Sequence, residues 1–174
     1  SLGQLELAIE YYEQAHALAR ETGNKRSQAI PLANLGNIYE SLGQHDQAIA
    51  CLTQAIDIAR DIGDLDSEST YLGNLGLVYG SLGQLDRSIE YSTQALAIAR
   101  KIGDQGSEGI HLGNLGDAFL RCHRREEAEK AFRKAIEICA DALPVGAGAF
   151  RGSLALLLAQ RGEMEEARNL LDMG

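Results

Sequence analysis

The sequence has very little proline, and it lacks the long apolar segments that cross membranes. Only Pro31 and Pro144 occur among its 174 residues, so little interrupts the formation of helices. No apolar run approaches the roughly 20 residues of a membrane-spanning helix. The chain also does not open with a charged segment followed by an apolar one, which would indicate a secretion signal. These absences predict a cytoplasmic protein with no membrane contact.

Positive charge and cysteine are also scarce. The 16 lysines and arginines are outnumbered by 25 aspartates and glutamates, for a formal net charge of −9. A nucleic-acid backbone is bound by a concentrated positive field, so we expect no nucleic-acid partner and favour a basic or neutral ligand. The cysteines, Cys51, Cys122 and Cys139, are odd in number and lie in helical patterns, so a disulfide framework is not expected.

The most informative feature is an internal repeat. Residues 41–80 align with residues 81–120 without a gap, and more than half of the positions are identical. Residues 1–40 join the same register, whereas residues 121–160 keep the apolar skeleton but lose most of the polar identities. The pattern predicts one array of duplicated units that becomes less regular towards its C-terminus.

Each unit has the hydrophobic spacing of two amphipathic helices. After the turn at Gly43, one helical stripe contains Ala48, Ile49, Leu52, Ala55, Ile56 and Ala59. A shorter stripe that contains Leu72, Leu75, Gly76 and Tyr79 predicts the other helix of the pair.

The residues between these helices are typical of helix ends. We expect Gly23, Gly63 and Gly103 to end helices in the left-handed conformation, each followed by an N-cap residue, Asn24, Asp64 or Asp104. Successive units are then joined almost without a loop. Within the first helix of its unit, expected to start near residue 25, Pro31 is predicted to cause a kink or a later helix start.

The repeated positions resemble a known family. Leu32, Leu35, Gly36 and Tyr39, followed by Gly43, Ala48, Leu52 and Ala55, resemble the signature of the tetratricopeptide repeat. In that signature a small residue on the first helix lets the second helix pack closely, and here leucine replaces the usual tryptophan. The 40-residue period is similar to that of the Pins/LGN polarity adaptors and of many bacterial multi-repeat proteins. The resemblance implies an all-α fold, a right-handed α-solenoid of antiparallel helix pairs with about nine helices.

The resemblance also suggests how the chain is divided. Residues 1–23 would be the second helix of a truncated repeat, followed by repeats at 24–63, 64–103 and 104–143 and by a degenerate or capping repeat at 144–174. We therefore interpret the chain as a fragment of a longer array.

In this family the first helices of the pairs line a concave surface that binds ligands. The inward-facing positions would be Ile30, Ala33, Asn34, Asn37, Thr70, Gly73, Asn74, Leu77, Ile110, Gly113, Asn114 and Asp117. Asn34, Asn74 and Asn114 would form a ladder of amides, which can pair with the main chain of an extended peptide because an amide is both donor and acceptor. The small residues Ala33, Gly73 and Gly113 are expected to leave room beside the amides. The family uses asparagine here to hold a ligand's backbone or carboxylate; alternatively, the amides bond to neighbouring helices and only set the repeat geometry.

Other side chains are expected to give the groove its selectivity. Ile30, Leu77, Ile110 and Leu120 would contact apolar side chains of the ligand. Arg121 begins a basic stretch and could anchor a ligand carboxylate. The alternative is that this stretch is a solvated helix face with ion pairs such as Glu126–Lys130 and Glu129–Arg133.

We find no pattern typical of a metal site, a cofactor site or a catalytic site. The histidines, His16, His45, His111 and His123, lack metal-ligand spacing. Gly73–Gly76 lies within a predicted helix, and the glycine-rich segment from Gly146 has Arg151 where a dinucleotide fingerprint needs glycine. We therefore expect no cofactor, no metal and no enzymatic activity.

These observations favour a non-enzymatic protein-interaction module that binds a partner peptide in the concave groove. Two alternatives remain open from the sequence. The array could be a spacer or a self-association element, with homo-oligomers formed through the exposed terminal helices. It could also be a regulatory sensor segment of a larger signalling ATPase.

Overall fold

The computed structural model describes residues 2–142 and 144–172, which form nine helices and no strand. The helices are α1 (Leu2–Glu21), α2 (Lys25–Ser41), α3 (His45–Asp61), α4 (Leu65–Ser81), α5 (Leu85–Ile102), α6 (Gln105–Arg121), α7 (Arg125–Ala142), α8 (Pro144–Gln160) and α9 (Met164–Asp172). None of these helices, within the part of the chain described, is long and apolar enough to cross a membrane.

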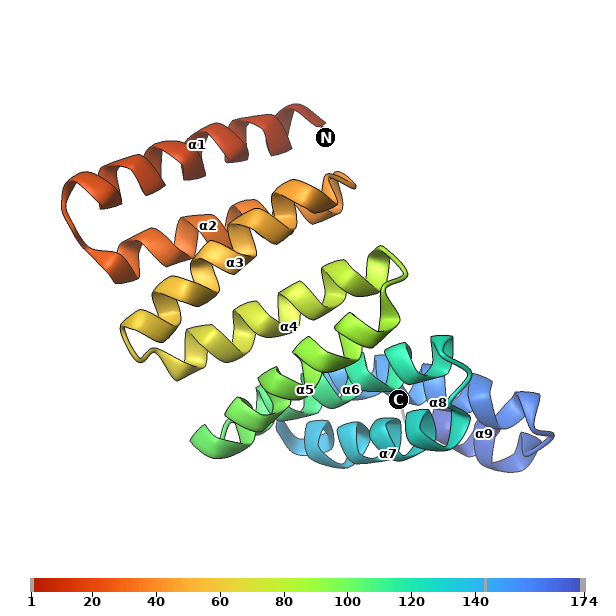
Figure 1. Ribbon diagram of the computed structural model, residues 1–174. Coiled ribbons are helices and arrows are strands. Elements are labelled where there is room, and N and C mark those ends of the chain that lie inside the picture. Colours follow the sequence, from red (N-terminus) through yellow and green to blue (C-terminus); the bar gives the residue numbers. More distant parts are fainter. Residues whose placement is uncertain (1, 143, 173–174) are drawn as a thin grey trace.

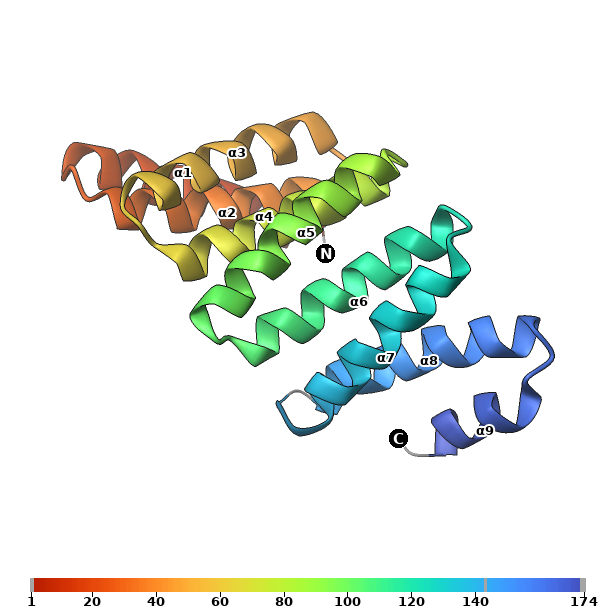
Figure 2. The same cartoon turned by 60° about the horizontal axis from the view of Figure 1, so that its bottom comes forward.

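The helices follow one another in a single curved array, with the two chain ends far apart (Figures 1 and 2). Each helix packs against the next one in the chain, and α2, α4, α6 and α8 also contact one another in series. These four even-numbered helices therefore form one layer of the array. The predicted α-solenoid of helix pairs is confirmed.

Glycines in the left-handed conformation end the helices where the sequence predicts them. Gly23, Gly63 and Gly103 have φ angles of 67°, 68° and 74°. The residues that follow are N-caps: Asn24 and Asp64 accept hydrogen bonds from the backbone amides of Ser27 and Ser67, and Asp104 caps α6 in the same way. The short junctions between units follow from this pairing of a glycine with a capping side chain.

Pro31 does not delay the start of its helix, so that alternative of the prediction is wrong. Helix α2 begins at Lys25 and contains Pro31 in its interior. The capping hydrogen bond, from the amide of Ser27 to the side chain of Asn24, lies in the first turn of α2, on the N-terminal side of the proline. Pro31 removes only the amide that would bond to the carbonyl of Ser27, four residues earlier.

His123 occupies a turn position at which the preceding repeats carry glycine. Its φ angle is 60°, in the left-handed region, where a residue with a Cβ is disfavoured by about 1–2 kcal/mol. We expect His123→Gly to raise the free energy of unfolding by about 1 kcal/mol in urea denaturation. The reciprocal change at the equivalent position, Gly83→His, should lower it. Equal stabilities of His123→Gly and the unaltered chain would contradict this prediction.

The two helices of each pair approach closely because one of them carries a glycine at the contact. A Cβ built on Gly36 would lie 2.6 Å from Leu52 Cγ, and one on Gly116 would lie 2.6 Å from Phe132 Cε1. Gly76 packs in the same way against Ser92. These are the small residues of the family signature, and their role in close packing is as expected.

Gly116→Ala is expected to lower the free energy of unfolding by about 1–3 kcal/mol, because the added methyl group overpacks the contact with Phe132. The matched control is Gly148→Ala in α8, where a Cβ would meet no atom within 4 Å. There alanine should stabilise the helix by up to about 1 kcal/mol through its higher helix propensity. Urea denaturation would measure both changes, and a gain for Gly116→Ala would contradict the prediction.

Candidate functional site

A hollow of about 600 Å³ opens on the layer formed by α2, α4 and α6. It is lined mainly by the C-terminal halves of these helices. Of the predicted groove residues, it includes Asn37, Asn74, Leu77, Asn114, Asp117, Leu120 and Arg121. Most of the predicted site is therefore brought together in one concavity.

The lining of this hollow does not include seven of the residues predicted to face inward: Ile30, Ala33, Asn34, Thr70, Gly73, Ile110 and Gly113. Asn34 is half-buried, whereas Ile30 and Ile110 are exposed, with 52% and 39% of their surface accessible. Ile30 and Asn34 are four residues apart on α2 and therefore lie on one helix face. Ile30 and Asn34 on α2 and Ile110 on α6 therefore lie beside the hollow, nearer the N-terminal ends of the helices that line it.

The three asparagines of the ladder occupy equivalent environments. Asn34, Asn74 and Asn114 are all half-buried. Within the described residues, none of the three side chains forms a hydrogen bond with another part of the chain. Their amide donors and acceptors therefore have no role in joining one helix to the next.

The small residues beside the ladder have a different role from the one predicted. Ala33, Gly73 and Gly113 are buried. A Cβ on Gly73 would lie 2.5 Å from His111 Cε1, and one on Gly113 would lie 2.0 Å from Phe150 Cε1. At Gly73 and Gly113 the expectation of room beside the asparagines is wrong, because a ring from the next first helix fills the space.

The ends of the even-numbered helices are tied together by polar contacts. Ser81 Oγ donates a hydrogen bond to Glu40 Oε1 at 2.9 Å. At the equivalent place one repeat later, Arg121 Nη1 donates a hydrogen bond to the carbonyl oxygen of Gly80 at 2.8 Å. Arg121 thus lies in the hollow, and one of its donors already binds the chain.

Asp117 of α6 is one of two acidic residues in the lining of the hollow, the other being Glu40. Burial raises the pKa of its carboxyl group, although a hydrogen bond from Ser153 and the nearby charge of Arg121 act in the opposite direction. A carboxylate that is partly desolvated gains by pairing with a donor or a cation. A donor group of a ligand would therefore find a favourable partner here.

The sequence analysis missed several residues of the hollow, including Glu40, Gly80, Ser81 and Ser88. Ser88 belongs to α5, a second helix, and second helices were not expected to contribute. A signal was present in the repeat alignment: Ser88 stands where the neighbouring units have Ala48 and Ala128.

A family model described as tetratricopeptide repeat matches residues 1–61 and 66–141. The chain belongs to the tetratricopeptide repeat family. Proteins of this family serve generally as interaction scaffolds, which supports a role in protein–protein interaction. No individual curated protein matches the sequence.

Solved structures with similar folds include tetratricopeptide repeat proteins of several kinds. A putative kinesin light chain from Podosopora anserina, described as having nearly identical TPR-like repeats, has a TM-score of 0.74 at 24% identity, over 98% of this chain and 85% of that one. A Rap protein complexed with competence and sporulation factor has a TM-score of 0.86 at 18% identity, over 99% of this chain and 49% of that one.

A third similar structure is that of a signal transduction ATPase from Pyrococcus horikoshii, which is described as having a tetratricopeptide repeat sensor. The TM-score is 0.79 at 19% identity, and the match covers 93% of this chain but 26% of that protein. This chain thus spans about half the length of the Rap protein and about a quarter of the ATPase. At these identities the similarities establish the fold.

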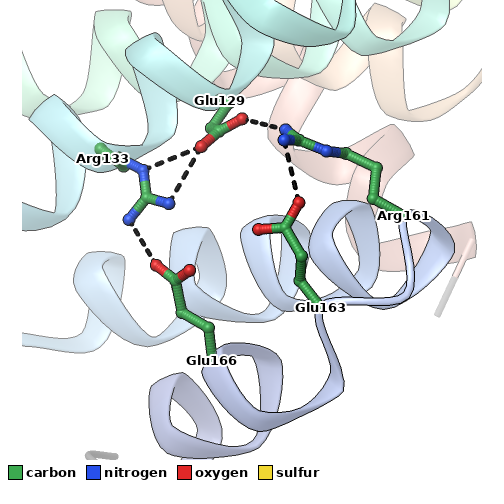
Figure 3. Close-up of polar contacts among 5 residues, drawn as sticks. All are labelled: Glu129, Arg133, Arg161, Glu163 and Glu166. Atoms are coloured by element: carbon green, nitrogen blue, oxygen red, sulfur yellow. Dashed lines mark hydrogen bonds and ion pairs between the residues drawn. The ribbon is translucent and has the colours of Figure 1, made fainter.

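Farther along the basic stretch of this tetratricopeptide repeat array, Arg133 belongs to an ion-pair network outside the hollow (Figure 3). Arg133 of α7 pairs with Glu129 at 2.9 Å and with Glu166 of α9 at 2.8 Å. Arg161 pairs with Glu129 and with Glu163. The predicted Glu129–Arg133 pair is confirmed, and the network fastens α9 to α7.

The other predicted pair is not formed. No ion pair joins Glu126 to Lys130 in the described residues; instead, Arg124 pairs with Glu127 and Lys134 with Glu137. Within the same residues, no group of three or more histidines, cysteines, aspartates or glutamates could hold a metal ion.

Proposed function

We propose that this array binds an extended segment of a partner protein in the hollow across α2, α4 and α6. The observation that carries the proposal is the set of equivalent asparagines, Asn34, Asn74 and Asn114, whose amides have no partner within the described chain. An amide can donate to a peptide carbonyl and accept from a peptide amide. Three of them, one repeat apart, would bind main chain without requiring a particular sequence.

Apolar side chains next to the ladder support the same role. Leu77 lines the hollow and has 47% of its surface accessible. Together with Leu120 in the hollow and with Ile30 and Ile110 beyond its edge, it would contact apolar side chains of the bound segment. Main-chain contacts then supply general affinity and these side chains supply selectivity. We infer a binding role without catalysis, with Arg121 and Asp117 contacting polar groups of the ligand.

The structural relatives are compatible with this proposal. The Rap protein was solved as a complex with competence and sporulation factor, and about half of that chain has a fold similar to this array. The ATPase from Pyrococcus horikoshii carries its repeats as a sensor. If this array is the sensor segment of a larger signalling protein, it would bind its signal through the same contacts in the hollow.

A displayed library of random peptides, selected against this chain, tests the proposal. Peptides enriched on the chain should bind the double variant Asn74→Ala/Asn114→Ala about a hundredfold more weakly, since each lost hydrogen bond contributes about 1 kcal/mol or somewhat more. The matched control is Asn169→Ala, which removes an exposed amide from α9. Equal binding to the double variant and to the unaltered chain would show that the asparagines do not hold the ligand.

A second candidate function is self-association through α1. Leu7, Tyr11 and Leu18 of this helix have 62%, 75% and 62% of their surfaces accessible. Such large exposed apolar side chains on one helix are typical of a contact surface. Sedimentation velocity over a wide dilution series should then reveal association that Tyr11→Arg abolishes; a monomer at every concentration would exclude this function.

A further inference from the structure

One repeat differs from its neighbours in the floor of the hollow. Gly80, at the end of α4, has no side chain where the neighbouring units have Glu40 and Leu120. Ser88 of α5 lines the hollow at this point. Because Gly80 has no side chain, Ser88 forms part of the floor of the hollow, and we call the part bordered by Gly80, Ser88 and Arg121 the recess.

Two donors lie next to Gly80 in this recess. A Cβ built there would lie 3.2 Å from Ser88 Oγ and 3.6 Å from Arg121 Nη1. The carbonyl of Gly80 accepts one hydrogen bond from Arg121, and a guanidinium has five N–H donors. Both side chains can therefore donate to an oxygen placed in the recess.

Ser88 differs from the residues at the same position in the neighbouring units. Only 5% of its surface is accessible, and the hydroxyl forms no hydrogen bond with any described part of the chain. Because Ser88 lines the hollow, its hydroxyl lies beside the space that a ligand would enter. The neighbouring units have Ala48 and Ala128 at the same position, so the repeat fold does not need a hydroxyl there.

We propose that this recess is an anchor site, in which Ser88 and Arg121 hold a side-chain oxygen of the bound segment. The occupant is a short side chain with an acceptor oxygen, namely aspartate or asparagine. A lysine or arginine would bring its cation next to the guanidinium of Arg121, and an apolar side chain would leave the hydroxyl and the guanidinium unpaired. This inference rests on the proposed function and specifies which register the segment adopts.

The charge around the recess bears on the choice between the two occupants. Glu40 and Asp117 border the same hollow, and the chain carries a net charge of −9. These charges oppose a carboxylate, whereas a carboxamide presents the same acceptor without charge. Binding of an aspartate-anchored peptide should therefore change with added salt, and binding of an asparagine-anchored peptide should change little.

The test couples a substitution in the protein to one in the peptide. Peptides selected from a displayed random library on the unaltered chain should share aspartate or asparagine at one position, and alanine at that position should weaken binding about tenfold. The Ser88→Ala variant has alanine at this position, as the neighbouring units do with Ala48 and Ala128. For this variant, the same change in the peptide should weaken binding by less than about threefold. Arg121→Ser, which copies Ser81, should reduce the coupling in the same way.

The control is Ser92→Ala, one turn further along α5. Ser92 is fully buried and does not line the hollow, so this variant should keep the tenfold effect of the peptide change. A tenfold effect that persists in both Ser88→Ala and Arg121→Ser would overturn the anchor site and leave peptide binding intact. A selected motif with a basic or apolar residue at the coupled position would overturn it as well. If no peptide is enriched on the unaltered chain, the proposed function fails, and this inference fails with it.

Discussion

Replacing Phe132 with alanine is expected to lower the free energy of unfolding by about 3–5 kcal/mol. The ring is completely buried. It packs with Leu154, Leu157 and Leu158 of α8 in one apolar cluster, and its edge fills the space next to Gly116. Alanine would leave a cavity that rigid helices on both sides cannot close.

The repeat itself supplies the control for this prediction. Leu52 occupies the equivalent position in an earlier unit, so Phe132→Leu should cost less than about 1.5 kcal/mol. Urea denaturation followed by circular dichroism would compare the two variants. Equal losses for alanine and leucine would show that the ring does not fill the contact as described.

A second large effect is expected from acidification, through His111. This side chain has only 4% of its surface accessible, and its Nε2 lies 3.1 Å from Ser69 Oγ. Ser69 Oγ donates to the carbonyl of Ala95, so it accepts a hydrogen bond from Nε2–H. The other ring nitrogen, Nδ1, is buried without a partner. Burial lowers the pKa of His111 from 6.5 to about 4, although Asp104 acts in the opposite direction.

The direction of the effect follows from these two values. The unfolded chain binds the proton near pH 6.5 and the folded chain only near pH 4, so stability is lost as the pH falls between them. A shift of this size corresponds to about 3 kcal/mol. The free energy of unfolding, measured at pH 7.5 and at pH 4, should therefore fall by about this amount through His111 alone.

The control for this prediction is His111→Phe. Phe150 packs against Gly113 in the same way as His111 packs against Gly73, so phenylalanine suits the position and cannot bind a proton. The variant should lose less stability on acidification than the unaltered chain. The same dependence on pH in both proteins would show that other groups are responsible.

Features that depend on neighbouring residues were predicted well from the sequence. The helix stripes, the left-handed glycines and the caps at Asn24 and Asp64 all follow from local spacing, and the structure confirms them. The prediction for Pro31 failed in part because a cap supports the first turn of α2 independently of the proline.

Features that depend on which helices meet could not be predicted in the same way. The rings of His111 and Phe150 fill the space beside Gly73 and Gly113, and helical spacing alone does not tell which side chain of the next repeat points there. The recess at Gly80 involves Ser88 of a second helix. The link from Arg133 to Glu166 likewise joins segments whose proximity only the folded chain shows.

The arrangement of contacts has a mechanical consequence. In the described chain, each helix touches only helices one or two places away in the sequence, so no contact bridges distant parts of the array. A small rotation at each interface between units adds along the chain. The interfaces between successive units therefore set the curvature of the whole array, and with it the spacing of the ladder asparagines.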